Sequence, residues 1–489
     1  MLAPLALSLS LLTALALARP GQAQINQLES PKVPAELNER IEAFLASHHA
    51  IDQLSGSVLI AEGDDVIYRG AYGLANSDWN IANTIDTKFR LASITKQFTS
   101  MLTLMLVRDG VLDLDAPMTT WLPDYPKESG DRVTLRHLLN HTSGIPSYTD
   151  IPGFLRTGLH DESVEEFVRT YCSDPLDFEP GTDFHYNNSA YFILGAIIEK
   201  VTGRTFRDVL HERILDPLGM DSTGMDDESA VVTGRATGYD DVLGGRRLAL
   251  WLDMSVPYAA GGMYSTVDDL FRWSQALDQK TLLDGELEAE MVTPGLGNYA
   301  FGWYVDLPED ADSKDGPTIH HSGGMPGVST LIWRQPAKER CVIVLGNSGT
   351  TAHYAIQYGL IELLEGRTPG PVRPRGDLEI SRRVLDDGIE AALEDWKKWP
   401  ENVRVDFIER DMNAIGYQLM EQRRFDEAQR IFEFLTVAYP DSANTWDSLG
   451  EWFARVGRTD EAIANYEKAL ELDPDSETVP AILERLRSR

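Results

Sequence analysis

Ser93 and Lys96 are the residues whose types and spacing are best suited to covalent chemistry. They lie three positions apart in the stretch FRLASITKQF, so a helix would place both on one face. A lysine removed from water has a lowered pKa and can act as a base, and a helix N-terminus favours the negative charge that develops during acyl transfer. The pair therefore indicates a nucleophilic serine activated by a lysine. The plainer alternative is that Ser93 only caps the helix and Lys96 extends to solvent.

Two further stretches carry polar groups that suit the same chemistry. In FHYNNSAYFILG, the Tyr186 hydroxyl could shuttle a proton and the Asn188 amide could hold a substrate carbonyl. In TIHHSGGMPG, glycines beside a strand would let a ligand backbone approach, and their N–H groups could complete an oxyanion hole. The structural alternatives are a helix cap for the first stretch and a simple hairpin turn for the second.

The elements that must position these residues mix β and α patterns over residues 33–367. GSVLIAEGDDVIYRGAYGLA predicts a hairpin near the start, and STLIWRQ and CVIVLGN predict two strands near the end. Helical patterns lie between them, among them TSMLTLMLVRDG, YFILGAIIEKVTG and STVDDLFRWSQAL, the last with Ser265 or Thr266 as its N-cap. Strands at both ends with an inserted helical region predict an α+β fold in which one antiparallel sheet is flanked by helices.

A different, all-α module is predicted at residues 378–489, after a Pro- and Gly-rich linker at residues 368–377. Gly450 follows Gly416 by 34 residues, and Pro474 follows Pro440 by the same interval. This period resembles tetratricopeptide repeats, here over residues 409–474, with helices on either side as caps. Small residues at fixed places would let the two helices of each repeat approach. The module either packs on the preceding domain or binds a protein partner.

Composition and the N-terminus bound the remaining possibilities. A formal net charge of −33 argues against nucleic acid or an anionic membrane as a partner. The apolar run at residues 5–18 is too short to span a bilayer and is followed by small residues, which predicts a signal peptide at residues 1–23 and a periplasmic or extracellular location. No Lys or Arg precedes this run, which departs from the usual pattern. Cys172 and Cys341 both lie in apolar patterns that predict small buried residues rather than a disulfide.

Taken together, the motifs resemble the serine β-lactamase and penicillin-recognising serine hydrolase family, most closely its class C-like branch with D,D-peptidases and esterases. SITK at residues 93–96 matches Ser-x-x-Lys, YNN at 186–188 matches Tyr-x-Asn, and HSG at 321–323 stands where Lys-Thr-Gly is usual. The stretches LLNHTSGIPSY, AAGGMYSTVDDLFRW and YAFGWYV are also similar to that family. The resemblance covers residues 37–366, with all motifs in the family's order, and implies a β-lactamase/transpeptidase-like fold.

The resemblance also implies a role for each site residue in an acyl-enzyme mechanism. Ser93 would attack a carbonyl, and Lys96 and Tyr186 would exchange the proton. The backbone N–H groups of Ser93 and Gly324 would bind the oxyanion. The remaining four residues would contact the substrate: Asn188, His321, Ser322 and Gly323. The family implies no metal and no organic cofactor.

His321 departs from the family pattern and bears on the choice of substrate. The usual lysine supplies a fixed cation that helps hold a substrate carboxylate, whereas a histidine is only partly charged near neutral pH. We therefore expect a secreted serine hydrolase that acts on an ester, an amide or a D-amino-acid peptide, with weak or no β-lactamase activity. The alternative from another class is a non-catalytic receptor that senses the cell wall or a ligand and passes the signal through a protein-binding repeat module.

Overall fold

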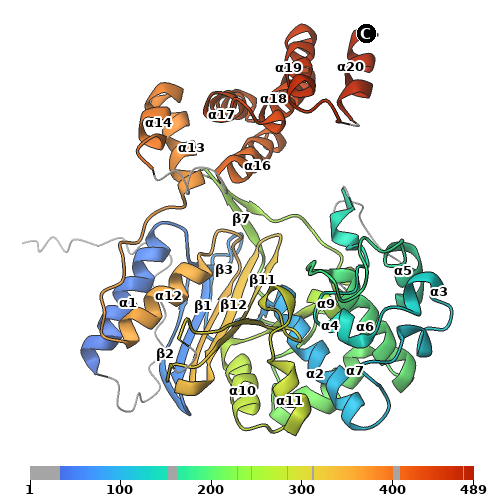
Figure 1. Cartoon of the computed structure of the whole chain (residues 1–489). Helices are drawn as coiled ribbons and strands as arrows, with labels where there is room; N and C mark the ends of the chain where they lie inside the picture. The colour runs from blue at the N-terminus through green and yellow to red at the C-terminus, as the bar shows by residue number, and fades with distance from the viewer. Residues whose placement is uncertain are drawn as a thin grey trace, which may run out of the picture. The chain divides into compact units, whose positions relative to one another are not determined.

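The computed structural model describes residues 34–151, 153–154, 162–227, 229–243, 245–283, 285–310, 313–399, 408–476 and 478–488. The predicted signal peptide at residues 1–23 lies outside these residues. The described chain forms two compact units (Figure 1), the first from residues 34–49, 54–238 and 250–369, and the second from residues 50–53, 239–249 and 370–488. Each unit has a hydrophobic core of its own.

Six strands of the first unit form one antiparallel sheet in the order β10-β11-β12-β13-β1-β2. Their bounds are β1 (Gly56–Glu62), β2 (Asp65–Tyr72), β10 (Tyr304–Asp306), β11 (Thr318–Met325), β12 (Val328–Gln335) and β13 (Arg340–Gly346). β1 pairs with β13 along its whole length. The predicted hairpin and the predicted late strands therefore share one sheet, and the α+β prediction is confirmed.

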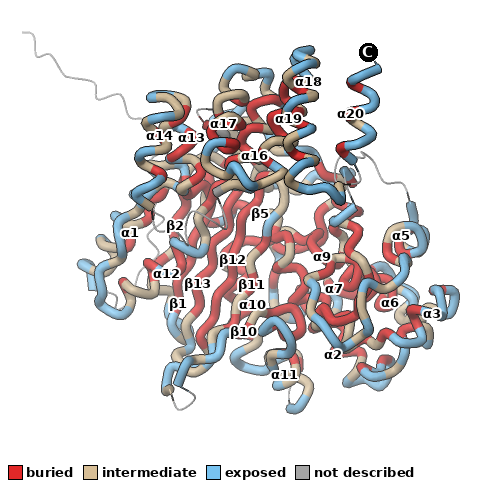
Figure 2. Tube along the Cα trace, turned by 45° about the horizontal axis from the view of Figure 1, so that its top comes forward, coloured by how far each residue is buried: buried red, intermediate tan, exposed pale blue. Residues whose placement is uncertain are grey.

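Helices cover both faces of this sheet. Successive strand residues point to opposite faces, so Val58 and Ile60 pack with α1 (Ala35–Ala50) and α12 (His353–Leu364), whereas Leu59 faces the larger core on the other side. Figure 1 shows α1 and α12 together on one face, and Figure 2 shows the strands buried along most of their length. Coverage of both faces explains why STLIWRQ and CVIVLGN are almost continuously apolar.

The inserted helical region predicted between the first and last strands is present and carries the candidate nucleophile. Its helices are η1 (Ala92–Ile94), α2 (Thr95–Arg108), η2 (Met118–Thr120), α3 (Lys127–Gly130), α4 (Leu135–Leu139), η3 (Tyr148–Asp150), α5 (Val164–Tyr171), α6 (Asn188–Thr202), α7 (Phe206–Leu210), η5 (His211–Leu215), α8 (Asp216–Leu218), α9 (Tyr258–Gly261), α10 (Val267–Asp278), α11 (Gly285–Met291) and η6 (Leu296–Asn298); η7 (Pro336–Lys338) follows β12. Short strands pair within it: β3 (Leu74–Asn76) with β4 (Ile81–Ala82), and β9 (Met263–Ser265) with both β5 (Phe89–Arg90) and β6 (Gly224–Met225). Thr266, one of the two predicted caps, accepts the Asp269 N–H at the start of α10.

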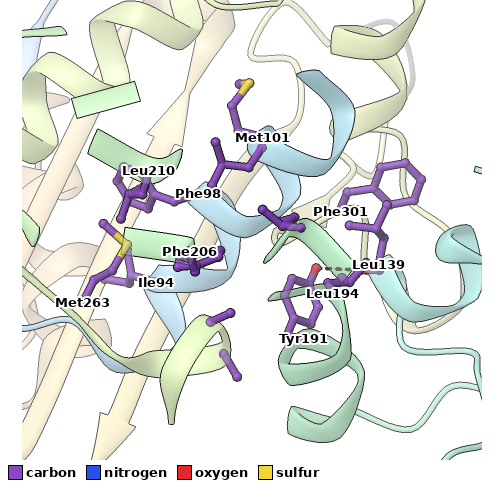
Figure 3. Packing of buried hydrophobic residues seen from close by; sticks show 14 of the residues in the cluster. Ile94, Phe98, Met101, Leu139, Tyr191, Leu194, Phe206, Leu210, Met263 and Phe301 are labelled. Atoms are coloured by element: carbon purple, nitrogen blue, oxygen red, sulfur yellow. Dashed lines mark hydrogen bonds between the residues drawn. The ribbon is translucent and has the colours of Figure 1, made fainter. Parts of the chain in front are cut away.

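The two central helices of this region, α2 and α6, are held by aromatic packing and buried hydrogen bonds (Figure 3). Phe98 of α2 stacks on Trp273 with 4.4 Å between ring centroids. Tyr191 of α6 donates a hydrogen bond to the Leu139 carbonyl at 2.7 Å and lies 3.1 Å from the Ser100 hydroxyl of α2. Close packing of this kind leaves side chains at the start of α2 little freedom to move.

The second unit contains helical hairpins with the predicted repeat. Its elements are the strands β7 (Tyr239–Val242) and β8 (Gly245–Leu248) and the helices α13 (Gly376–Asp387), α14 (Ile389–Trp396), α16 (Ile408–Glu421), α17 (Phe425–Ala438), α18 (Ala443–Arg455), α19 (Thr459–Leu472) and α20 (Val479–Arg487). A Cβ on Gly416 would lie 2.5 Å from the Phe432 ring, and one on Gly450 would lie 3.2 Å from Tyr466. Glycine at these repeat positions therefore permits the close helix approach expected from the sequence.

Three further observations concern predictions from the sequence. Cys172 and Cys341 are free and buried, as expected for small apolar residues. Of the helices in the described ranges, none is both long and apolar enough to cross a membrane. Tyr239–Ala249 lies within the predicted hydrolase domain in sequence, yet the structure places it in the second unit.

Candidate active site

Ser93 lies in η1, a single tight turn directly before α2. The residue at the N-cap of α2 is Ile94, and no side chain caps this end, so the helix-cap alternative for Ser93 does not apply. The preceding residue, Ala92, has a φ of +49°, a left-handed conformation that is strained for a residue other than glycine. Two hydrogen bonds at Leu91 hold it there: the Thr330 hydroxyl donates to the Leu91 carbonyl at 2.9 Å, and the Leu91 N–H donates to the Met263 carbonyl at 2.8 Å. The backbone before the nucleophile is therefore fixed from outside the turn.

Lys96 is completely buried, and its Nζ has three polar neighbours. The distances are 3.3 Å to Ser93 Oγ, 2.8 Å to Asn188 Oδ1 and 2.9 Å to the Ala260 carbonyl oxygen. Burial lowers the pKa of Lys96 well below its usual value, which favours the neutral amine. A neutral amine has two N–H groups and one lone pair. The amide and carbonyl oxygens can only accept, so they take the two N–H groups, and the lone pair faces the Ser93 hydroxyl.

Two aromatic rings adjoin the same amine. Nζ of Lys96 lies 4.8 Å from the ring centroid of Tyr186 and 5.4 Å from that of Tyr191. Ring faces attract a cation, so they would stabilise the ammonium that forms once Lys96 has taken the serine proton. Burial favours the base before the transfer, and the rings reduce the cost of the charge after it.

Tyr186 places its buried hydroxyl in the same group of residues. It makes no hydrogen bond of ordinary geometry to the described residues. Burial raises the pKa of Tyr186, and the nearby Ser93 hydroxyl opposes part of that rise. The phenol therefore keeps its proton at neutral pH and can act as a proton donor.

Asn188 contacts Lys96 in addition to lining the pocket where a substrate is expected. It lines the pocket beside Ser93, but its oxygen accepts the Lys96 hydrogen bond and its Nδ2 donates to Thr149 Oγ1 at 3.1 Å. Its oxygen is therefore used by Lys96, whereas Thr149 uses one of the two N–H groups of Nδ2. The Asn188 backbone N–H donates to Ser147 Oγ at 3.1 Å, so the segment around residues 147–149 fixes this side chain.

His141 is a site residue that sequence reasoning did not assign. Its Nδ1 accepts the Asn187 backbone N–H at 3.1 Å, and its ring centroid lies 4.4 Å from that of Tyr186 and 4.5 Å from that of Tyr299. Burial lowers the pKa of His141 well below its usual value. A neutral His141 is thus the acceptor that holds the Tyr186–Asn188 turn.

The glycines of β11 allow the sheet to approach the nucleophile closely. A Cβ on Gly323 would lie 2.0 Å from the Leu91 carbonyl oxygen, whereas one on Gly324 would meet nothing within 4 Å. Ser93 and Gly324 line the same pocket, as the predicted oxyanion hole requires. Thr318–Met325 is a complete strand that pairs with β12, so this stretch is more than a hairpin turn.

His321 is buried beneath the site. Its Nδ1 lies 2.6 Å from the Ser322 carbonyl oxygen, which can only accept, so Nδ1 carries the proton and Nε2 accepts from the Tyr299 hydroxyl at 3.0 Å. Burial lowers the pKa of His321 to about 3. The partly charged histidine expected from the sequence is therefore neutral here, and His321 is not among the residues lining the pocket.

The pocket over Ser93 has a volume of about 100 Å³, and the described residues that line it are uncharged. Besides Ser93, Asn188 and Gly324, the described lining residues are Ala92, Tyr148, Thr149, Leu252, Val256, Pro257, Ala260, Gly261, Met325 and Pro326. A larger cavity of about 400 Å³ lies between the loop at residues 122–126, α5 and α6, and contains none of the predicted site residues. Proximity to Ser93 and Lys96, rather than size, identifies the smaller pocket as the candidate active site.

Comparison with known proteins agrees with this geometry. Residues 37–364 match the family described as Beta-lactamase. The chain belongs to the beta-lactamase family. Residues 443–476 match the tetratricopeptide repeat family, so the second unit contains a repeat of that type.

Relatives of this beta-lactamase-family chain include a penicillin-binding protein, an esterase and an amidase. A penicillin-binding protein of Bacillus subtilis (strain 168) is 31% identical, covering 69% of this chain and 78% of the relative. Esterase EstB of Burkholderia gladioli is 36% identical, covering 61% of this chain and 88% of the relative. The solved D-amino acid amidase of Ochrobactrum anthropi SV3 is 27% identical with a TM-score of 0.58, covering 68% of this chain and 99% of that one. The chain is therefore a serine hydrolase with a Ser-x-x-Lys motif.

The residues that sequence reasoning did not assign lie inside stretches that already resembled the beta-lactamase family. His141 belongs to LLNHTSGIPSY, Ala260 to AAGGMYSTVDDLFRW and Tyr299 to YAFGWYV. These residues could have been found from the sequence by asking which residues of a family-like stretch had no assigned role.

Proposed function

We propose that this serine hydrolase cleaves neutral esters and amides with an apolar acyl group through an acyl-enzyme. The observation that carries the proposal is that the pocket over Ser93 is lined by uncharged residues in the part of the chain that the structure describes. A charged group moved from water into such a pocket loses hydration without gaining a partner, which is costly. An apolar acyl group gains free energy on entering it.

The proposed reaction uses the groups already placed around Ser93. Ser93 Oγ attacks the substrate carbonyl carbon while its proton passes to the lone pair of Lys96 Nζ. The N–H groups of Ser93 and Gly324 stabilise the oxyanion. The tetrahedral intermediate collapses as the leaving group takes, through the Tyr186 hydroxyl, the one proton that Lys96 received. Water then attacks the acyl carbonyl while giving a proton to Lys96, which passes it to Ser93 Oγ as the acid product leaves.

The same pocket disfavours substrates that carry a carboxylate beside the scissile bond, which include β-lactams and peptides ending in D-alanine. A neutral, buried His321 supplies no cation for that carboxylate, and the described lining residues supply none either. The name of one relative, an esterase, is consistent with neutral ester substrates. We therefore expect weak β-lactam hydrolysis.

A matched pair of substrates tests this proposal. The 4-nitrophenyl ester of butanoic acid and the 4-nitrophenyl monoester of succinic acid have acyl chains of equal length and differ by one terminal carboxylate. The neutral ester should have a kcat/KM at least about 10-fold higher, which corresponds to about 1.4 kcal/mol of discrimination. D-Phenylalanine amide and a chromogenic cephalosporin complete the panel. Equal rates on the two esters, or faster turnover of the cephalosporin, would contradict the proposal.

Export and a partner for the repeats complete the proposal. The apolar N-terminal run and its small-residue sites support removal of residues 1–23 during secretion. N-terminal sequencing of protein recovered from the periplasm or medium checks this, and an intact Met1 in the cytoplasm would contradict it.

The repeat match at residues 443–476 supports a protein partner, which affinity capture with the Ser93→Ala chain would identify.

A further inference from the structure

The first unit contains a second cavity, of about 400 Å³, between the loop at residues 122–126, α5 and α6. None of the described residues that line it also lines the pocket over Ser93. Small-molecule sites have volumes of roughly 300–1,000 Å³. The cavity is therefore large enough to hold a ligand of its own, apart from a substrate at Ser93.

The floor of this cavity is apolar and is fixed before any ligand binds. Tyr125 and Val168 are buried, and the Tyr125 hydroxyl already donates to the Cys172 carbonyl oxygen at 2.6 Å. Phe167 of α5 stacks on Phe192 of α6 with 4.1 Å between ring centroids, and Figure 1 shows the two helices side by side. Packed elements of this kind keep their shape, so the apolar part of a ligand could enter with little rearrangement.

The rim of the cavity carries charges of both signs. The acidic lining residues are Asp124, Glu165 and Glu199, and the basic ones are Arg169 and Lys200. Glu199 already accepts a backbone N–H at the start of α7, at 2.8 Å. The other four form no ion pair within the residues that the structure describes. One opening therefore offers both a cation and a carboxylate to a ligand.

Glu165 and Arg169 show most clearly that these charges are not used by one another. They lie four residues apart on α5, in the order that favours an ion pair on a helix. Glu451 and Arg455 have the same spacing and order on α18, and they form an ion pair at 2.8 Å. Although both lie in the described part of the chain, Glu165 and Arg169 form none, and both line the cavity. A ligand could therefore pair with each of them without breaking an existing ion pair.

Ligands of other charge types fit this rim less well. A neutral apolar molecule would shield the rim charges from water without giving them partners, which is costly. A purely anionic ligand would be repelled by the three carboxylates, and a purely cationic one by Arg169 and Lys200. A zwitterion avoids these costs, and its apolar groups gain free energy on the floor of the cavity.

We propose that this cavity binds a small zwitterionic peptide with apolar side chains. The carboxylate of the peptide pairs with Arg169, its ammonium pairs with Glu165, and its side chains contact Tyr125 and Val168. Glu165 and Arg169 are one helical turn apart, and their side chains can reach the two ends of a dipeptide, which spans about 7 Å when extended. The inference concerns a site separate from Ser93 and does not depend on the proposed hydrolysis.

Calorimetric titration of the full chain carrying Ser93→Ala tests the ligand class, since this chain cannot cleave a probe through an acyl-enzyme. The probes are the dipeptide phenylalanyl-leucine, its N-acetyl derivative, which lacks the ammonium, and its C-terminal amide, which lacks the carboxylate. The dipeptide should bind about threefold or more tightly than either blocked form, as expected for one exposed ion pair. Equal affinities for the three probes, or no binding at about 10 mM dipeptide, would overturn the inference.

Substitutions test which charge meets which end of the dipeptide. Arg169→Gln should weaken dipeptide binding about threefold and leave the affinity for the C-terminal amide unchanged. Glu165→Gln should weaken dipeptide binding similarly and leave the affinity for the N-acetyl form unchanged. Lys127→Gln is the matched control, because it removes an exposed cation that follows the lining residue Pro126 but does not line the cavity. An equal loss in Lys127→Gln and Arg169→Gln would indicate only long-range charge attraction and would overturn the inference.

Hydrogen exchange locates the bound dipeptide. Saturating phenylalanyl-leucine should slow exchange in peptides covering residues 122–126 and 164–171, because the ligand stabilises the loop and α5 against local opening. Slower exchange confined to residues 250–261 and 324–326 would place the dipeptide over Ser93 and would overturn the inference. None of these measurements uses turnover, so a failure of the wild type to hydrolyse esters would contradict the proposed function alone.

Discussion

Replacing Lys96 with methionine tests whether the lysine is neutral in the folded protein. Methionine has a similar length and does not titrate, so the two chains differ in proton binding at one position. Burial lowers the pKa of Lys96 in the folded protein, whereas an unfolded lysine has a pKa of about 10.4. At a pH between these two pKa values, the unfolded chain binds a proton that the folded chain does not bind.

The expected magnitude follows from this difference in proton binding. The stability of the wild type contributed by this group is fully present above about pH 10.4 and is lost as pH falls toward the folded pKa. The free energy of unfolding of Lys96→Met minus that of wild type should therefore decrease by about 1.4 kcal/mol for each unit of rising pH in this window. Methionine also leaves Asn188 Oδ1 and the Ala260 carbonyl without a donor, at about 1–3 kcal/mol each. That cost is independent of pH, so the protonation state of Lys96 is tested by how the stability difference varies with pH.

Urea unfolding of the full-length proteins at pH 7, 8, 9 and 10 measures this slope, read from the transition of the first unit. Lys200→Met, on the exposed end of α6, controls for the loss of one positive charge. Ester hydrolysis by Lys96→Met should fall about 10²- to 10⁴-fold, as expected for loss of a general base. A stability difference that does not vary between pH 7 and pH 10 would show that Lys96 is charged in the folded protein, and the base assignment would be refuted.

Two other substitutions test how the nucleophile and the Tyr186–Asn188 turn are held. Gly323→Ala should lower the melting temperature and slow ester hydrolysis by roughly 100-fold, since its Cβ would lie 2.0 Å from the Leu91 carbonyl oxygen. Gly324→Ala places its Cβ in open space and should keep the wild-type melting temperature. Equal melting temperatures of the Gly323→Ala and Gly324→Ala proteins in calorimetry would contradict this account. His141→Phe keeps the ring packing but leaves the Asn187 N–H without its acceptor, and kcat should fall roughly 10- to 100-fold with KM little changed; steady-state kinetics showing an unchanged kcat would remove His141 from the site.

The features that could be predicted from the sequence depend on short-range spacing. Ser93 and Lys96 are three residues apart, which predicts that their side chains lie on one side of a helical turn, and each of the first and last strands is recognised from its own short apolar run. The repeat was equally accessible, because Gly416 and Gly450 recur at a fixed interval whose packing reason is local to each helix pair. These features required no knowledge of how distant segments meet.

The features that could not be predicted depend on contacts between distant segments. His321 is neutral because Tyr299 and the core enclose it, and the residue type alone suggests a partly charged group. The Asn188 oxygen is used by Lys96, a residue 92 positions away. The hairpin at Tyr239–Ala249 belongs with the repeat helices because Leu243 is buried among them, and its short strands do not reveal this association in advance.

Acylation of Ser93 is the most direct test of the central claim that a serine activated by a neutral lysine is the nucleophile. Intact-mass spectrometry after rapid mixing with the 4-nitrophenyl butanoate ester should show wild-type protein heavier by one butanoyl group, with peptide mapping that places it on Ser93. Ser93→Ala should gain no mass, and Lys96→Met should gain it far more slowly. A butanoyl group mapped to another residue, or equal labelling of Ser93→Ala, would contradict the account.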